Sequence, residues 1–290
     1  MIVADHRDQV INNIRQAVAE ERFNDKVEVG DPILSTEAKT QAVDNYLKRS
    51  HTLHFKIANW IARTFMAIAT WLTNRTTTVS GWENLSSLAK HQGAIITTNH
   101  FNPLENTVPR LLARHEHRRL FIVSQDTNLA MTGGLGYLMN NLDIIPLSKR
   151  LDYLGRELPA LIQQATAAGH FVLIYPEQEM WFNYRKPRPP KRGTYYYAAK
   201  ANVPIISCFT EIRSEKKLAT PEFHETSYHL HILPLIYPDP KLSANANATR
   251  MMNQDYAQKK AAYEAAYHEP LSYQFEPQDI VGWIPDRAQQ

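Results

Sequence analysis

Two short apolar segments of the chain each end in residues capable of acid–base chemistry. Residues 93–97 lead to His100, and a carboxylate, Glu105, follows the histidine after four intervening residues. Residues 170–174 lead to a second carboxylate, Glu177. Because the carboxyl ends of parallel strands meet at one edge of a sheet, we expect these three side chains to form one site.

His100 and Glu105 are the residue types of a general-base dyad. A neutral imidazole takes the proton of a hydroxyl as its oxygen attacks a carbonyl, and a carboxylate on the far ring nitrogen fixes the tautomer and stabilises the imidazolium. A helix is predicted to start here, with Asn102 as its N-cap and Pro103 in its first turn. Glu105 also fits a capping box, in which its carboxylate bonds the backbone N–H of Asn102. The two roles of Glu105 are compatible, and both stay open.

A cationic segment follows the second carboxylate. Residues 181–193 combine aromatic residues and prolines with five cations within eight positions: Arg185, Lys186, Arg188, Lys191 and Arg192. Such a segment can hold a phosphate, an anionic carrier or an anionic lipid surface, and a solvated loop is the alternative. The net charge of +3 for the whole chain is too small to indicate a nucleic-acid-binding protein, so no nucleic-acid partner is expected.

Other motifs give weaker indications. The glycine-rich residues 133–136 do not follow a strand with the spacing of a dinucleotide-binding fingerprint. His229 and His231 share one face of a predicted strand but lack a third ligand at a telling spacing, so no metal site is predicted. The single cysteine excludes an internal disulfide and a cysteine-cluster metal site, which is typical of a reducing cytoplasm.

The alternation of apolar runs and helical segments predicts an α/β fold. A mixed, largely parallel sheet flanked by helices is expected, with helical N- and C-terminal extensions. The expected parts are a helical N-terminal region at 1–75, an α/β domain at 76–240 and a C-terminal helical extension at 241–290. The predicted strands are 77–80, 93–98, 120–124, 143–147, 171–175, 204–209 and 228–236. The predicted helices are 8–22, 36–48, 53–74, 104–114, 128–140, 150–168, 195–201 and 242–268.

The helix at 53–74 is predicted to be amphipathic. At about 100° per residue its apolar residues share one side: Ile57, Ile61, Phe65, Ile68 and Leu72. Its polar side carries Lys56, Asn59, Arg63, Thr70 and Asn74, with Trp60 and Trp71 at the borders. This pattern suits a helix lying in a membrane interface, and a surface helix with its apolar side on the core is the alternative. Since no spanning segment or signal peptide is visible, a peripheral protein on the cytoplasmic face of the membrane is expected.

Four segments resemble, in order and spacing, the motifs of the glycerolipid acyltransferases that convert lysophosphatidic acid to phosphatidic acid, and of their lysophospholipid-acylating relatives. Residues 99–105 resemble the first motif, asparagine-histidine-four residues-aspartate, and 136–150 resemble the second, which ends in a phosphate-binding cation. Residues 175–180 resemble the third, aromatic-proline-glutamate-glycine-threonine-arginine, and 203–206 resemble the fourth, an apolar strand with proline. The resemblance covers roughly residues 76–235.

Two motifs depart from the family pattern. Glu105 replaces the aspartate of the first motif, giving a histidine-four residues-glutamate spacing. Gln178, Glu179 and Met180 stand where the third motif has glycine, threonine and arginine. The missing arginine removes an expected phosphate ligand, so we expect other cations to replace it or the acceptor to differ from glycerol phosphate.

The resemblance implies a fold like that of glycerol-3-phosphate acyltransferases and transfer of an acyl group from acyl-CoA or acyl-carrier protein to a glycerolipid hydroxyl. It implies His100 as general base, Glu105 as its partner, Glu177 on the acceptor polyol, and neither a metal nor a bound cofactor. The further substrate-binding residues expected are Asn99, Asn102, Lys149, Arg150, Arg185, Lys186 and Arg188. The expected partners are an anionic membrane surface, a lysolipid acceptor and the acyl donor.

Two alternatives to the transferase remain open. An acyl-ester hydrolase would use the same dyad to activate water, although the chain lacks the Gly-x-Ser-x-Gly elbow of serine hydrolases. A non-catalytic lipid-surface protein would keep the fold without the reaction.

Overall fold

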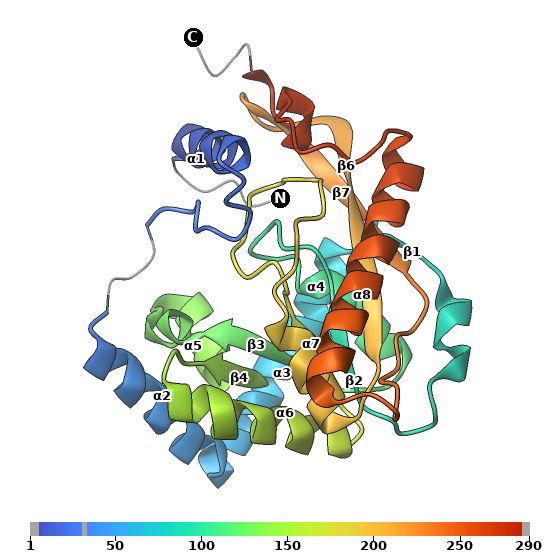
Figure 1. The fold of residues 1–290 in the computed structure, drawn as a ribbon. Coiled ribbons are helices and arrows are strands. Elements are labelled where there is room, and N and C mark those ends of the chain that lie inside the picture. The colour runs from blue at the N-terminus through green and yellow to red at the C-terminus, as the bar shows by residue number, and fades with distance from the viewer. Residues whose placement is uncertain (1–5, 31–33, 286–290) are drawn as a thin grey trace.

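A seven-stranded mixed sheet forms the centre of the protein in a computed structural model that describes residues 6–30 and 34–285 (Figure 1). The strand order is β1-β7-β6-β2-β5-β3-β4, and every pairing is parallel except that of β6 with β7. The strands are β1 (Thr78–Ser80), β2 (Ala94–Thr97), β3 (Leu120–Gln125), β4 (Ile144–Leu147), β5 (Phe171–Ile174), β6 (Ile205–Thr220) and β7 (Phe223–Ile232). The predicted fold class, a largely parallel mixed sheet flanked by helices, is therefore confirmed.

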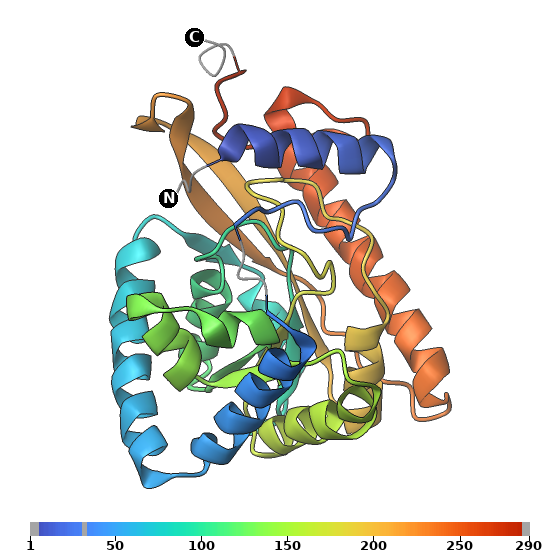
Figure 2. The same cartoon turned by 90° about the vertical axis from the view of Figure 1, so that its left-hand side faces the viewer.

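Helices surround this sheet (Figure 2). They are α1 (Arg7–Ala19), α2 (Thr36–Ser50), α3 (Leu53–Thr73), α4 (Thr107–His115), α5 (Gly133–Asn141), α6 (Leu158–Ala167), α7 (Gly193–Ala201) and α8 (Ala244–Tyr267). Shorter turns are η1 (Trp82–Ser87), η2 (Asp126–Ala130), the π-helical η3 (Tyr153–Glu157) and η4 (Pro277–Asp279). Helix α3 packs on α4 and α5, whereas α7 packs on α6 and α8. The three-part division at 75 and 240 stays a prediction. Residues 1–5 of its first part and 286–290 of its last part lie outside the described residues.

The two central strands that lead to the candidate site are fully buried. All four residues of β2 and all four of β5 are buried, and the two strands pair in register from Ala94 with Phe171 to Thr97 with Ile174. A strand covered on both faces needs apolar residues at successive positions, which these short apolar runs provide. The pairing therefore brings the ends of β2 and β5 side by side.

Several predicted elements differ from the observed ones at their ends; β7, for example, spans Phe223–Ile232 instead of 228–236, and α5 spans Gly133–Asn141 instead of 128–140. Strand β6 runs to Thr220, far past the predicted end at residue 209, because it continues as an exposed, charged arm of the β6–β7 hairpin that an apolar run does not reveal. Helix α4 begins at Thr107, and residues 103–106 form turns, so Asn102 is not its N-cap.

Helix α3 presents its apolar side outward. The large apolar residues on that side are exposed: Leu53, Ile57, Trp60, Ile61, Phe65, Ile68, Trp71 and Leu72. Its opposite side is buried and includes Asn59, whose amide donates to the Asn141 carbonyl at 2.8 Å and to Asp143 at 3.0 Å. The alternative in which the apolar side packs on the core is therefore wrong. Among the described residues, no helix is long and apolar enough to cross a membrane.

A second hydrophobic cluster joins α1 to the C-terminal segment around Ile280. Apolar residues of α1 pack with residues of the 181–184 loop, the β6–β7 hairpin and the C-terminal segment: Val10, Ile11, Ile14, Ala17, Val18, Val27, Trp181, Phe182, Tyr184, Phe223 and Ile280. Figure 1 shows α1 and the C-terminal segment near the same end of the hairpin. Helix α1 is thus held against the loop that follows Glu177.

Candidate active site

His100 lies at the carboxyl edge of the sheet, three residues beyond the end of β2. Tyr175 follows β5 directly, and its ring stacks on the His100 imidazole with ring centroids 4.1 Å apart and planes 11° from parallel. Burial, and then the negative charge of Glu105, raise the pKa of the Tyr175 hydroxyl. A neutral aromatic ring therefore supports one face of the imidazole.

The Glu105 carboxylate contacts both the His100 ring and the backbone of the turn that follows it. Its Oε1 contacts the His100 Nδ1 atom, while its Oε2 accepts hydrogen bonds from the backbone N–H groups of Phe101 and Asn102, the latter at 2.8 Å. Because α4 begins only at Thr107, the second set of bonds closes the turn before the helix instead of capping it. With Nδ1 on the carboxylate, the Nε2 atom is the ring nitrogen left to a substrate hydroxyl.

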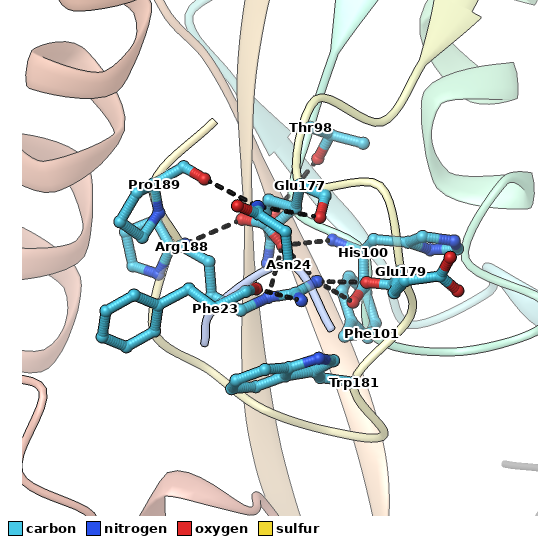
Figure 3. A network of polar contacts seen from close by, with 12 residues as sticks. Phe23, Asn24, Thr98, His100, Phe101, Glu177, Glu179, Trp181, Arg188 and Pro189 are labelled. Atoms are coloured by element: carbon cyan, nitrogen blue, oxygen red, sulfur yellow. Dashed lines mark hydrogen bonds and ion pairs between the residues drawn. The ribbon is translucent and has the colours of Figure 1, made fainter. Parts of the chain in front are cut away.

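Glu177 faces protein groups. Its Oε2 accepts from the His100 backbone N–H at 3.1 Å and from the Arg188 Nε at 3.0 Å, and its Oε1 accepts from the Arg188 backbone N–H at 2.9 Å (Figure 3). The residue is 3% exposed. These contacts place Glu177 against the backbone of the candidate base and leave the expected acceptor-polyol role without support.

The expected phosphate-binding cations divide into paired and unpaired residues. Arg185 and Lys186 are buried against Asp279, with Lys186 Nζ 2.7 Å from its carboxylate, and Arg188 pairs with Glu177. A cation already neutralised in the interior is a poor ligand for a substrate phosphate. The structure therefore gives no support to phosphate binding by these three residues.

The second-motif cations also differ from each other. Arg150 lies within 3.8 Å of three carboxylates, those of Asp44, Asp152 and Glu157. Lys149 is exposed and forms no ion pair within residues 6–30 and 34–285. Only Lys149 of this pair has its charge available to a ligand.

The two asparagines of the first motif have separate environments. The Asn99 amide bonds both backbone groups of Thr210, donating at 3.0 Å and accepting at 2.8 Å, and so joins the site to β6. The Asn102 Oδ1 accepts from the Leu104 backbone N–H at 3.1 Å, while its buried Nδ2 has no hydrogen-bond partner among the described residues. Asn99 is therefore committed to the scaffold, whereas Asn102 retains a free donor.

The third-motif turn adopts a conformation that favours glycine. Gln178 has a φ of 72°, in the left-handed region that residues with a Cβ atom rarely occupy. This is the position at which the family pattern has glycine. A glutamine therefore adopts the left-handed conformation at this position.

Sequence reasoning missed two contributors to the site. The third motif indicates Tyr175 only as its aromatic residue, whereas the stacking on His100 follows from the register of β2 with β5. Asn24 donates to the carbonyls of Glu177 and Pro189 at 3.2 and 2.9 Å, and no local signal in the N-terminal segment indicates this distant contact.

A possible metal-binding group lies outside this site. Among the described residues, Glu211, His229 and His231 place ligand atoms within 4.8 Å of one another. The Arg213 guanidinium donates to Glu211 at 2.6 Å and to the His229 Nδ1 atom at 3.0 Å. A cation already occupies these acceptors and opposes a metal ion there.

Comparisons with known proteins agree with the motifs. Residues 76–211 match the Acyltransferase family, and no curated protein sequence matches the chain. Among solved structures, the protein is similar to the 1-acyl-sn-glycerophosphate acyltransferase PlsC from Thermotoga maritima, with a TM-score of 0.50 and 16% identity over 82% of this chain and 96% of that one. The likeness concerns the fold, and the family match includes His100, Glu105, Lys149 and Glu177. Residues 76–211 therefore match the Acyltransferase family, within a chain whose fold is similar to that of this PlsC protein.

Proposed function

We propose that the protein transfers a fatty acyl group from acyl-CoA or acyl-carrier protein to a hydroxyl of a glycerolipid. The observation that carries the proposal is the contact between His100 Nδ1 and the buried Glu105 at the carboxyl edge of the parallel sheet. In this geometry Nε2 accepts the hydroxyl proton while the hydroxyl oxygen attacks the thioester carbonyl. The carbon–sulfur bond then breaks, and the thiolate takes the proton from the imidazolium.

Asn102 is the proposed polar contact to the substrate beside this dyad. A buried donor without a partner costs free energy, and a substrate oxygen that accepts from Nδ2 removes this cost. The proposed partner is the acyl oxygen, on which negative charge develops as the hydroxyl attacks.

Lysines are the proposed ligands of an acceptor phosphate. Lys149 follows β4, three strands from β2 and so about 14 Å along the sheet edge at the usual strand spacing. Lys191 is nearer, because its backbone N–H donates to the Pro176 carbonyl at 2.8 Å, and its side chain is exposed. Both cations can reach an acceptor that extends from His100 along this edge.

The membrane surface is the proposed source of the acceptor. The outward apolar side of α3 carries Trp60, 67% exposed, and Phe65, 59% exposed. An apolar helix side with interfacial tryptophans and nearby cations suits the boundary of an anionic bilayer. Arg75 lies over the Trp71 ring at 4.4 Å and Lys56 is exposed, which supplies cations at that boundary.

An assay of the wild-type protein with a labelled acyl thioester tests the proposed reaction. Label should appear in a diacyl lipid only when a lysolipid is present. Label released as free fatty acid without regard to lysolipid would replace the transferase by a hydrolase.

A further inference from the structure

A single buried guanidinium connects the N-terminal segment to the candidate base. Arg188 donates from Nη1 to the Phe23 carbonyl at 2.9 Å and from Nη2 to the His100 carbonyl at 3.3 Å (Figure 3). The same Nη2 also contacts the Glu179 carbonyl, and the guanidinium lies over the Trp181 ring at 4.4 Å. Its remaining interaction is the ion pair with Glu177 at 2.8 Å.

The peptide groups of His100 are held from both sides by this network. The His100 N–H donates to Glu177, and Glu177 forms an ion pair with Arg188. The His100 carbonyl accepts from Arg188 and from the Trp181 N–H at 3.0 Å. The imidazole direction is then set by the backbone at this residue and by Glu105. Any change in the Arg188 guanidinium therefore acts on the base through its backbone.

The N-terminal segment closes the loop that supplies Arg188. Asn24 donates to the carbonyls of Glu177 and Pro189, the two ends of the 177–189 loop, and Phe23 gives its carbonyl to Arg188. The guanidinium can satisfy these acceptors together because its five N–H groups lie in one plane. A lysine ammonium keeps the charge but not this fork.

We infer that Arg188 is a positioning residue for His100, and that the N-terminal segment completes the active site by fixing Arg188 through Phe23 and Asn24. This inference rests on the proposed function. It assigns a role to the chain before α2. In the third motif Met180 stands where the family has arginine, and Arg188 of the following loop supplies a guanidinium instead. The role differs from phosphate binding, because every direction of this guanidinium faces a protein group.

Arg188→Lys and Arg7→Lys form a matched pair for the test. Arg7 is also a buried arginine, and it lies beside the second hydrophobic cluster. It pairs with Glu28 at 2.9 Å, and its guanidinium lies 4.1 Å from the centroid of the Phe182 ring. Arg188→Lys should lower kcat for acyl transfer by about 10- to 100-fold with KM within about twofold, since misplacing a catalytic group by about 1 Å costs that much. Arg7→Lys should lose comparable thermal stability while kcat stays within twofold of the wild type.

Asn24→Ala tests the contribution of the N-terminal segment. It removes both side-chain bonds to the 177–189 loop, whereas Asn13→Ala removes only a bond inside the N-terminal segment, to the Val27 carbonyl at 2.9 Å. We expect Asn24→Ala to lower kcat several-fold and Asn13→Ala to leave it unchanged. In a double-mutant cycle, Asn24→Ala should cost less in the Arg188→Lys background than alone, because both act on one network.

Several results would overturn the inference. These are an Arg188→Lys variant with wild-type kcat, equal loss of kcat in Arg188→Lys and Arg7→Lys, or fully multiplicative effects in the cycle. An acceptor-specific rise in KM for Arg188→Lys would instead indicate phosphate binding.

If the wild type transfers no acyl group, the proposed function fails, but the positioning of His100 can still be tested by NMR. The His100 ring resonance is identified by its loss in His100→Ala. It should shift in Arg188→Lys and stay in place in Arg7→Lys, and a resonance unmoved in both would contradict the inference.

Discussion

One oxygen of the Glu105 carboxylate contacts the His100 Nδ1 atom, and the other accepts hydrogen bonds from the backbone N–H groups of Phe101 and Asn102. The longer glutamate thus serves both the candidate base and the turn that presents it. An aspartate has one methylene fewer and would have to approach the imidazole from a different backbone position. The departure from the family pattern at this residue is therefore accommodated by the local turn.

Glu105→Gln should affect rate and stability together. A glutamine has one acceptor oxygen, so it cannot accept from Phe101 and Asn102 and also hold the His100 tautomer. We expect acyl transfer to slow by at least about 100-fold, with a loss of about 1–3 kcal/mol in the free energy of unfolding from the charged hydrogen bonds. Kinetics and urea unfolding of one preparation measure both. A rate loss without a stability loss would remove the turn-forming role.

Gln178→Gly should stabilise the protein. At φ 72° the Cβ atom of Gln178 is unfavourable, and glycine relieves this at the cost of more chain entropy in the unfolded state. The expected net gain is about 0.5–1 kcal/mol in urea unfolding. Gln163→Gly in the exposed interior of α6 is the control and should lose a similar amount. If both variants lose stability, the positive φ of Gln178 carries no strain.

At the scale of elements, α3 shows the limit of sequence periodicity. The 3.6-residue period predicts which residues of 53–74 share a side, but the same pattern fits a helix with that side on the core or in a membrane. The packed side is decided by distant partners. Asn59 bonds Asn141 and Asp143, more than 80 positions along the chain, and these bonds fix the side of the helix that carries Asn59 inward.

The exposed side of α3 should bind anionic vesicles. Ile57→Asp combined with Ile68→Asp should lower the vesicle-bound fraction at least about tenfold in apparent affinity, since each fully buried isoleucine contributes about 1.5–3 kcal/mol. Both residues are exposed, so the free energy of unfolding should change little. Leu242→Asp, at an exposed leucine outside α3, is the control and should sediment with the vesicles like the wild type. Equal sedimentation of all three proteins would contradict the proposed docking side.

At the scale of the whole molecule, the C-terminal helix is tied to the strand that leads to His100. Asp255 of α8 is fully buried, accepts from Thr97 of β2 at 2.9 Å and pairs with Lys259 at 2.8 Å. Cys208 of β6 lies in the same core. Burial raises the pKa of the Cys208 thiol to about 12.

Cys208 should report opening of this core. In the native protein its thiol should resist a thiol reagent such as DTNB, with a labelling rate that rises with urea as the core opens. Because the folded-state pKa lies above the ordinary value of 9.0, the unfolded chain ionises first, and stability from this group is complete below about pH 9 and falls above it. Ser214→Cys in a Cys208→Ala background, at an exposed site of β6, is the rapid control. Fast labelling of native Cys208 would show that the core is open.

The sequence predicted the fold well where local pattern decides it. The buried runs at β2 and β5 are apolar, so their ends and the nearness of His100 to Glu177 were predictable. The environment of the cations at 185–192 was not predictable, because their partners include Asp279 and Glu269, which lie far along the chain. A run of cations has the same sequence pattern whether it is solvated or paired with buried carboxylates. The role of Phe23 and Asn24 depends on the same kind of long-range packing.

The most direct test of the proposed reaction is an assay with radiolabelled acyl-CoA and acyl-carrier protein against a panel of lysolipids, run on the wild type and on His100→Ala. The wild type should place label in a diacyl lipid, and His100→Ala, correctly folded, should lose typically about 10²–10⁴-fold of that rate. A fully active His100→Ala protein would contradict general-base catalysis at this site.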